Sequence, residues 1–228
     1  MNCVVTTAIA TAGLCLLAGG LSAQAAQPAG AGDVIIRAGA TWVVPNEDTH
    51  TIGGELAPAL AGTDVAVDDD LQFGLTVAYR LTDRIDIELL AASPFRHDVS
   101  LRGGALAGTE LGSIKHLTPM VSIDYHFDTG TPFEPYVGAG VNYTLFFDEH
   151  VDDAAAAVGV TDLDLSNSFG PAAQIGLDYN LGEHFLLNAN VRYLQIDTEA
   201  RVRTATGTTN VDLDIDPWVY TLAVGYRF

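Results

Sequence analysis

The chain has little cysteine and little positive charge. Its two cysteines, Cys3 and Cys15, both lie near the N-terminus, so the rest of the chain can hold neither a disulfide framework nor a thiolate metal site. Only 10 of the 228 residues are Lys or Arg, whereas 29 are Asp or Glu, and the formal net charge is −19. Nucleic-acid binding depends on neutralising phosphates with cationic side chains, so this balance argues against nucleic acid as a partner.

Long hydrophobic runs are also scarce, although 48% of the residues are hydrophobic and only 17% are charged. The one long run, residues 4–23, is followed by a small-x-small pattern that ends at Ala25, as in secretory signal peptides. We expect residues 1–25 to be a cleaved signal peptide and residues 26–228 to form one domain. Because no Lys or Arg precedes the run, a retained anchor helix is the alternative.

Apolar and polar residues alternate with a period of two in eight segments, which predicts eight β-strands. These segments are residues 33–44, 70–82, 84–95, 115–127, 133–147, 169–181, 184–197 and 211–228. Short links with turn-forming residues alternate with long links, predicted to be loops, over residues 45–69, 96–114, 148–168 and 198–210. Short turns at one end and long loops at the other, with an even strand count, are typical of an antiparallel up-and-down transmembrane β-barrel.

The two faces of each predicted strand differ in size as well as polarity. Leu71, Phe73 and Leu75 share one face of the second strand, whereas Gly74 and Thr76 share the other. Small residues fit the narrow lumen of an eight-stranded barrel and large apolar ones fit lipid, so the apolar face is predicted to point outwards. The outward aromatic residues should form two interface girdles. The girdle near the long loops is expected to contain Trp42, Phe95, Tyr143, Phe147, Phe169, Tyr193, Trp218 and Tyr220.

Several stretches carry a family resemblance that spans nearly the whole mature chain in order. They include GDVIIRAGATWVVPNED, SIKHLTPMVSIDYHF, FEPYVGAGVNYTLFFDE and DPWVYTLAVGYRF. These stretches resemble the outer membrane protein W (OmpW) family. The resemblance implies a monomeric all-β barrel in the outer membrane of a Gram-negative bacterium. It also implies uptake of small hydrophobic molecules, as in related alkane-uptake proteins. In outer-membrane proteins generally, a terminal Phe is part of the signal read by the barrel assembly machinery, and Phe228 occupies that position.

The inward face of the predicted strands divides into a charged half and an apolar half. The charged residues, towards the short turns at the periplasmic end, are Arg37, Arg80, Asp86, Glu88, Asp124, His126, Asp178 and Arg227. The apolar residues, towards the long loops, are Leu90, Ala92, Met120, Phe146, Leu194 and Val219. Charges of mixed sign can pair inside a narrow lumen, so we expect the charged half to close the periplasmic end below an apolar funnel. Ordinary core packing is the alternative interpretation.

Proline cannot donate to a β-ladder, so a proline within a predicted strand indicates a bulge or a break. Pro94 and Pro119 lie on neighbouring predicted strands and mark a candidate gap in the barrel wall, although they could simply mark strand ends.

The charged and histidine-containing loops suggest salt bridges rather than chemistry. Arg201 and Arg203 are expected to pair with Asp212 or Asp214, in preference to divalent cations that would bridge these carboxylates to lipopolysaccharide. No nucleophile motif or metal-ligand spacing surrounds any histidine, and histidines in loops are expected to be solvated. We therefore expect no catalytic residue, no metal and no cofactor.

These patterns lead to one main hypothesis about function and one alternative. The hypothesis is an outer-membrane channel for small hydrophobic molecules, with an apolar extracellular funnel, a closed periplasmic end and release sideways into the membrane. Its expected partners are outer-membrane lipid and lipopolysaccharide, hydrophobic solutes and the barrel assembly machinery. The alternative is a surface protein without transport, whose acidic loops contact lipopolysaccharide, phage or host partners.

Overall fold

The computed structural model describes residues 29–46, 48–54, 63–103, 107–157, 159–204 and 207–228. Within these ranges the chain forms strands and one short helix, α1 (Asp153–Ala157). None of the described residues belongs to a helix of the length and hydrophobicity that crossing a membrane requires. The expected signal peptide, residues 1–25, lies outside the described residues and stays a prediction.

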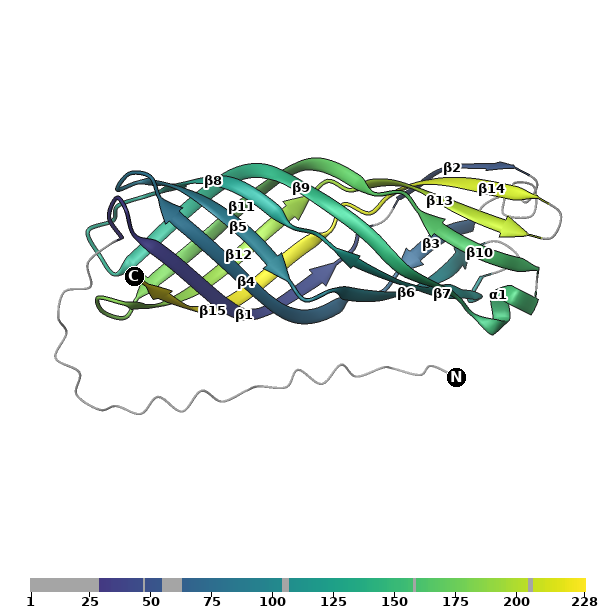
Figure 1. The fold of residues 1–228 in the computed structure, drawn as a ribbon, viewed down its shortest axis with the longest axis horizontal. Coiled ribbons are helices and arrows are strands. Elements are labelled where there is room, and N and C mark those ends of the chain that lie inside the picture. The colour runs from purple at the N-terminus through teal and green to yellow at the C-terminus, as the bar shows by residue number, and fades with distance from the viewer. Residues whose placement is uncertain (1–28, 47, 55–62, 104–106, 158, 205–206) are drawn as a thin grey trace, which may run out of the picture.

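Eight strands close into an antiparallel barrel, drawn at the left of Figure 1. Neighbouring strands pair in chain order, and the first and last close the ring with Ile35 opposite Arg227 and Val44 opposite Trp218. The predicted all-β, eight-stranded up-and-down fold is therefore confirmed. The barrel strands are β1 (Val34–Val44), β4 (Asp70–Arg80), β5 (Ile85–Ala92), β8 (Met120–His126), β9 (Phe133–Val151), β11 (Ser168–Asn180), β12 (Phe185–Leu194) and β15 (Trp218–Arg227).

The three short links form tight connections at one end of the barrel, called here the turn end. They cover residues 81–84, 127–132 and 181–184. In the second connection Gly130 has a φ of 65°, and its N–H donates to the Asp128 carboxylate at 2.9 Å. Glycine adopts this left-handed conformation without steric cost, which explains why the chain can turn here.

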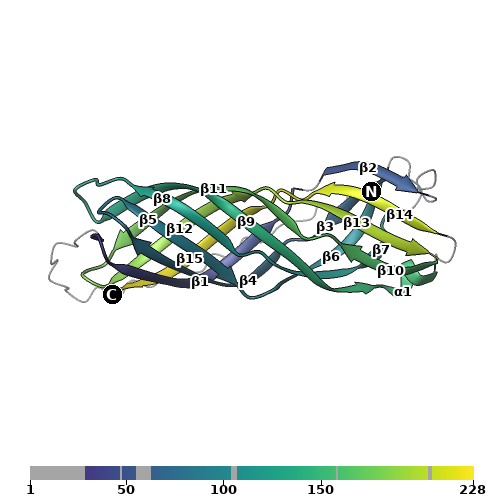
Figure 2. The same cartoon turned by 45° about the horizontal axis from the view of Figure 1, so that its top comes forward.

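At the opposite end, the hairpins extend well beyond the barrel (Figure 2). Two four-stranded walls form this extension, one from β3, β6, β7 and the far part of β9, the other from β10, β13, β14 and β2. Much of the chain predicted as long loops is therefore strand. Outside lipid the outward face need not be apolar, so these strands lack the strong alternation of the barrel. Their bounds are β2 (Asp48–Gly54), β3 (Thr63–Val67), β6 (Phe95–Gly103), β7 (Glu110–Leu117), β10 (Val160–Leu165), β13 (Asp197–Thr204) and β14 (Thr208–Asp214).

The barrel and the extension meet at a junction where most strands are interrupted. Among the described strands, β9 alone runs through the junction; the other seven barrel strands are each separated from their extension strand by two or three residues. Four of the interruptions contain proline, namely Pro45, Pro94, Pro119 and Pro217. Because proline has no N–H to donate, these residues end a ladder without leaving an unsatisfied donor.

Large apolar side chains cover the outside of the barrel, as predicted. Phe73, Ile123, Ile175 and Leu222 are all exposed, and their side chains point away from the lumen. At the junction, Trp42 donates from its indole nitrogen to Asp69 at 2.7 Å, which orients one member of the girdle there. An apolar band with aromatic residues at its margins is what a lipid bilayer requires.

Phe95 is the exception, because its side chain is buried inside the molecule at the junction instead of joining the girdle. The interruption at Ser93 and Pro94 changes the parity of the chain, so that both Leu90 and Phe95 point inwards. An extra residue between two strands moves every later side chain to the other face. Phe228 lies exposed at the end of β15, and its role in insertion stays a prediction.

We predict that Gly140→Ala destabilises the barrel by about 1–3 kcal/mol, the usual cost of overpacking. A Cβ at Gly140 would lie 2.0 Å from the carbonyl oxygen of Val121 and 2.7 Å from the Cα of Ser122, both in the backbone of β8. Urea unfolding in lipid vesicles measures the change. The control is Ala139→Val, at the adjacent lipid-facing position, which should unfold like the wild type. Equal midpoints for all three proteins would contradict the prediction.

Candidate functional site

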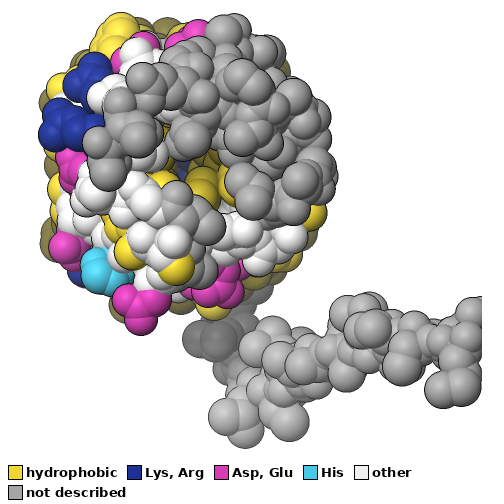
Figure 3. All heavy atoms as spheres, turned by 90° about the vertical axis from the view of Figure 1, so that its right-hand side faces the viewer, with side chains coloured by type: hydrophobic (Ala, Val, Ile, Leu, Met, Phe, Trp, Pro, Cys, Tyr) yellow, Lys and Arg dark blue, Asp and Glu magenta, His cyan; other side chains and the backbone are white. Residues whose placement is uncertain are grey.

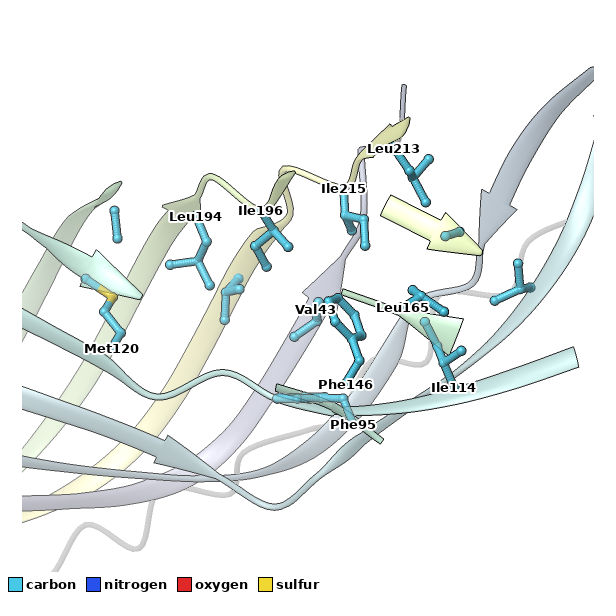
Figure 4. Packing of buried hydrophobic residues seen from close by; sticks show 14 of the residues in the cluster. Val43, Phe95, Ile114, Met120, Phe146, Leu165, Leu194, Ile196, Leu213 and Ile215 are labelled. Carbon is cyan, nitrogen blue, oxygen red and sulfur yellow. The ribbon is translucent and has the colours of Figure 1, made fainter. Parts of the chain in front are cut away.

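An apolar cluster fills the inside of the molecule at the junction (Figure 4). The view onto the far end of the extension shows hydrophobic side chains inside a central hollow (Figure 3). All six residues expected to form the apolar half of the lumen lie in or against this cluster, with Ala92 partly buried at its edge. The cluster includes Val43, Leu90, Phe95, Ile114, Met120, Phe146, Leu194, Ile196, Ile215 and Val219.

Two small cavities lined by described residues lie within the apolar cluster. One has a volume of about 20 Å³ and borders Leu90, Phe95, His116 and Leu194. The other has a volume of about 10 Å³ and borders Ile114 and, again, His116. A water molecule needs roughly 10–15 Å³ of such space, so each cavity holds little more than one water. Neither cavity has room for a solute unless the side chains that border it move.

Below the apolar cluster, a polar floor of buried, ion-paired residues crosses the lumen. Its centre is Glu88, whose two oxygens each accept from a different arginine: Arg37 at 2.7 Å and Arg192 at 2.8 Å. Arg37 also pairs with Asp178. Each of these four side chains is at most 2% exposed. Because the three strands β1, β5 and β12 supply Arg37, Glu88 and Arg192, one carboxylate ties separate parts of the wall together.

A second ion-paired group lies nearer the turn end. Arg80 pairs with Glu134, and its Nη2 also lies 3.0 Å from Nδ1 of His126. His126 contacts Asp86 through Nε2 at 2.9 Å. Burying one member of such a group alone would be very unfavourable, whereas the mutual contacts offset much of the desolvation cost. The two groups together fill the lower lumen with charge.

Two further residues assigned to the charged half have different surroundings. Asp124 accepts hydrogen bonds from Gln174 at 2.6 Å and from Ser122 at 3.3 Å. Arg227 lies at the rim of the turn end, where its Nε donates to the carbonyl oxygen of Glu183 at 2.8 Å. The structure thus brings most of the predicted charged residues together and places Arg227 at the edge.

Sequence reasoning left two important members of the floor without a role. Arg192 shares its face with Asn188 and Asn190, so strand parity alone could have assigned it to the lumen. Tyr136 is 1% exposed, and its hydroxyl accepts from both asparagines at 3.0 and 2.9 Å. The only sequence signal that separates Tyr136 from the aromatic residues of the girdle is its even position in β9, which it shares with the inward-facing residues of that strand.

An open seam separates two strand pairs beside the apolar cluster. The β5–β8 ladder ends with Leu90 opposite Met120, and the β6–β7 ladder begins with Phe95 opposite His116. Between these pairs, residues 91–94 and 117–119, all of them described, are not paired with each other. Their other neighbours stay in place: Ala91 and Ala92 pair with β4, and the carbonyl of Pro119 accepts from Tyr143 at 3.0 Å. Pro94 and Pro119 both lie in this seam.

Two expectations about the loop side chains were wrong. His97 and His116 are buried, 2% and 6% exposed, because the strands β6 and β7 that carry them continue the inner wall. Arg203 pairs with Asp162 of the neighbouring strand β10 at 3.0 Å, and Arg201 with Glu199 at 3.3 Å. In the register of these strands Arg203 lies opposite Asp162, which explains the choice of partner.

Among the side chains that the structure describes, no three His, Cys, Asp or Glu residues are grouped so that they could hold a metal ion.

The closed barrel, its apolar outer band and its ion-paired lumen define the class of the protein as a transmembrane β-barrel of the bacterial outer membrane. The chain belongs to the OmpW family, whose family model matches residues 30–228. Outer membrane protein W of Vibrio cholerae is 41% identical over 199 residues, which cover 86% of this chain and 89% of that protein. The outer membrane of a Gram-negative bacterium is therefore the location of this chain.

One solved structure and one distant relative complete the comparison. The crystal structure of OprG from Pseudomonas aeruginosa superposes with a TM-score of 0.81 at 41% identity, covering 87% of this chain and 97% of that chain. The dibenzothiophene metabolism operon protein PahQ of Pseudomonas aeruginosa is 24% identical over 177 residues, covering 78% of this chain and 79% of that protein.

We predict that Glu88→Ala destabilises the barrel. Arg37 and Arg192 would each lose a buried partner, which typically costs about 3–5 kcal/mol. Urea unfolding in vesicles should show a lower midpoint for the variant than for the wild type. The control, Glu110→Ala, removes an exposed carboxylate and should leave the midpoint unchanged. Equal midpoints for Glu88→Ala and the wild type would show that these ion pairs contribute little to stability.

Proposed function

We propose that the protein takes up small hydrophobic solutes, which enter the apolar cluster from the extracellular end and leave sideways into the membrane. The observation that carries the proposal is the order of the layers along the lumen: the apolar cluster lies towards the extension, and the polar floor lies below it. A hydrophobic solute gains by leaving water for the cluster. To continue downwards it would have to separate buried ion pairs, at a cost of several kcal/mol.

The open seam supports a sideways route. It lies beside Leu90 and Met120, which belong to the apolar cluster, so the cluster and the lipid are separated there by side chains without a continuous backbone ladder. The seam is close to the outer girdle, since Ala92 lies opposite Gly74 and the girdle residue Trp42 lies opposite Leu71, three residues further along β4. Opening it requires no broken β5–β8 or β6–β7 hydrogen bond.

The relatives are compatible with this substrate class. PahQ is named for an operon of dibenzothiophene metabolism, and dibenzothiophene is a small hydrophobic aromatic compound. At 24% identity this name suggests a class of solute and no particular compound. The small cavities imply that the cluster must rearrange when a solute enters.

We predict that Met120→Asp lowers the uptake of a hydrophobic probe about tenfold or more. A carboxylate at this position, 1% exposed in the apolar cluster, would carry water into the route and repel an apolar solute. Uptake of a radiolabelled hydrocarbon by Gram-negative cells carrying the protein measures the effect. The matched control is Met120→Leu, which conserves volume and polarity and should retain uptake. Wild-type uptake by a folded Met120→Asp barrel would favour the alternative, a surface protein without transport.

We also predict that closing the open seam blocks release. Residues 26–228 contain no cysteine, so Ala91→Cys with Leu117→Cys introduces one outward-facing thiol on each border of the seam. A short bifunctional thiol reagent that joins them should abolish most of the uptake. The control pair, Ile87→Cys with Ile123→Cys, lies on β5 and β8 where the strands are already paired, and joining it should have little effect. Unchanged uptake after complete cross-linking of the seam would rule out this exit.

A further inference from the structure

Two buried histidines of the extension lie beside the proposed route without a role in it. His97 of β6 and His116 of β7 bring their Nε2 atoms within 2.9 Å, and their rings are nearly parallel with 4.9 Å between centroids. Phe95 stacks with His116 at 5.4 Å, and Phe146 packs against the same ring at a tilt. Phe95 and His116 form the first strand pair beyond the open seam. The histidine pair therefore faces the passage that a solute would use.

The outer partners of the two rings fix where their protons lie. Nδ1 of His97 bonds to the carbonyl oxygen of Asp68, which can only accept, so this nitrogen carries a proton. Burial lowers the pKa of both histidines, to about 3 for His116, where neighbouring His97 adds to the effect. Both rings are thus neutral at pH 7. Nε2 of His97 must then accept from Nε2–H of His116, and Nδ1 of His116 accepts from the Thr118 hydroxyl at 3.0 Å.

The bond between the two Nε2 atoms is the one that a solute could replace. The other two bonds tie the pair to Asp68 and Thr118, whereas this one joins the rings only to each other. His116 borders both cavities in the apolar cluster. A hydroxyl group donates and accepts at once, so it can insert between the rings, donating to His97 and accepting from His116. One hydrogen bond is then exchanged for two, which a pure hydrocarbon cannot do.

We propose that His97 and His116 form a selectivity site that favours aromatic solutes bearing a hydroxyl group, such as phenols and naphthols. This inference rests on the proposed uptake function and names its preferred substrate class. A hydroxyl buried in the apolar cluster without a partner would be unfavourable, and the histidine pair supplies that partner. The Phe95 and Phe146 rings beside the pair offer faces and edges against which an aromatic ring can stack.

The test compares uptake of 1-naphthol with uptake of naphthalene, which differ by one hydroxyl group. Cells carry the wild type, His116→Phe, or the double variant His97→Leu with His116→Phe, which keeps an apolar, ring-filled core. In both variants the ratio of 1-naphthol to naphthalene uptake should fall about five- to tenfold, as expected for the loss of one net hydrogen bond. His184→Phe is the control. His184 is exposed at the turn end, and its replacement should leave the ratio unchanged.

The outcomes separate this inference from the function on which it rests. Retained naphthalene uptake with a lower ratio supports both. A ratio equal to that of the wild type, or an equal loss of both probes from a folded variant, overturns the selectivity site while uptake stands. If cells that carry the wild-type protein take up neither probe faster than cells without it, the proposed function is overturned, and the inference with it.

A direct binding measurement keeps the inference testable if the variants fail to fold. The refolded wild-type protein with ¹⁵N-labelled histidine is titrated with each probe, and the imidazole nitrogen signals are followed by NMR. We expect 1-naphthol to shift the Nε2 signals of His97 and His116 and naphthalene to leave them largely in place. Equal shifts with both probes, or no shift with 1-naphthol at saturation, would overturn the site.

Discussion

In the hydrocarbon core of a membrane, backbone N–H and C=O groups cannot form hydrogen bonds with water and must pair with each other, and the rest of the structure depends on this constraint. Eight strands satisfy it by closing on themselves through β1 and β15. Interruptions of the ladder are then tolerable only near the edge of the lipid, and the structure gathers them at the junction. There Asn142 shows how a freed group is satisfied: its amide donates to the carbonyls of Gly170, Pro171 and Gln195, all within 3.2 Å.

The narrow lumen imposes a second constraint, because eight strands leave room for side chains and little else. Charges placed there cannot be hydrated freely, so they must satisfy one another. Glu88 does this for two arginines at once, and Arg37 in turn serves two carboxylates. The same crowding explains the apolar cluster, where hydrophobic side chains fill the space instead. Polarity along the lumen is therefore a consequence of packing as much as of function.

Much of this could be predicted from the sequence wherever a strand is unbroken. Alternation places Met120 and Leu194 inside and Ile123 outside, because one period of two holds along the whole strand. It fails just past Pro94, where the interruption reverses the parity and carries Phe95 and His97 inwards. Composition also hid the extension, since strands outside lipid need no apolar outer face.

The contacts between side chains on different strands could not be predicted, because the pattern within one strand does not say which residues lie opposite it. The choice of Arg192 for Glu88 joins residues 104 positions apart, and the two histidines meet only because β6 pairs with β7. Such contacts depend on register.

The continuity of β9 has a mechanical consequence. Seven strands of the barrel are interrupted where they meet the extension. The eighth, β9, runs from Phe133 to Val151 as one continuous strand and pairs with β8, β7 and β11 along its length. A load applied to the extension would travel into the membrane-embedded part chiefly along this strand. Any tilting of the extension would pivot about β9 and move the far side most, at β1, β4 and β15. The side of the protein that contains β9 is therefore stiffer than the opposite side, where every strand is interrupted.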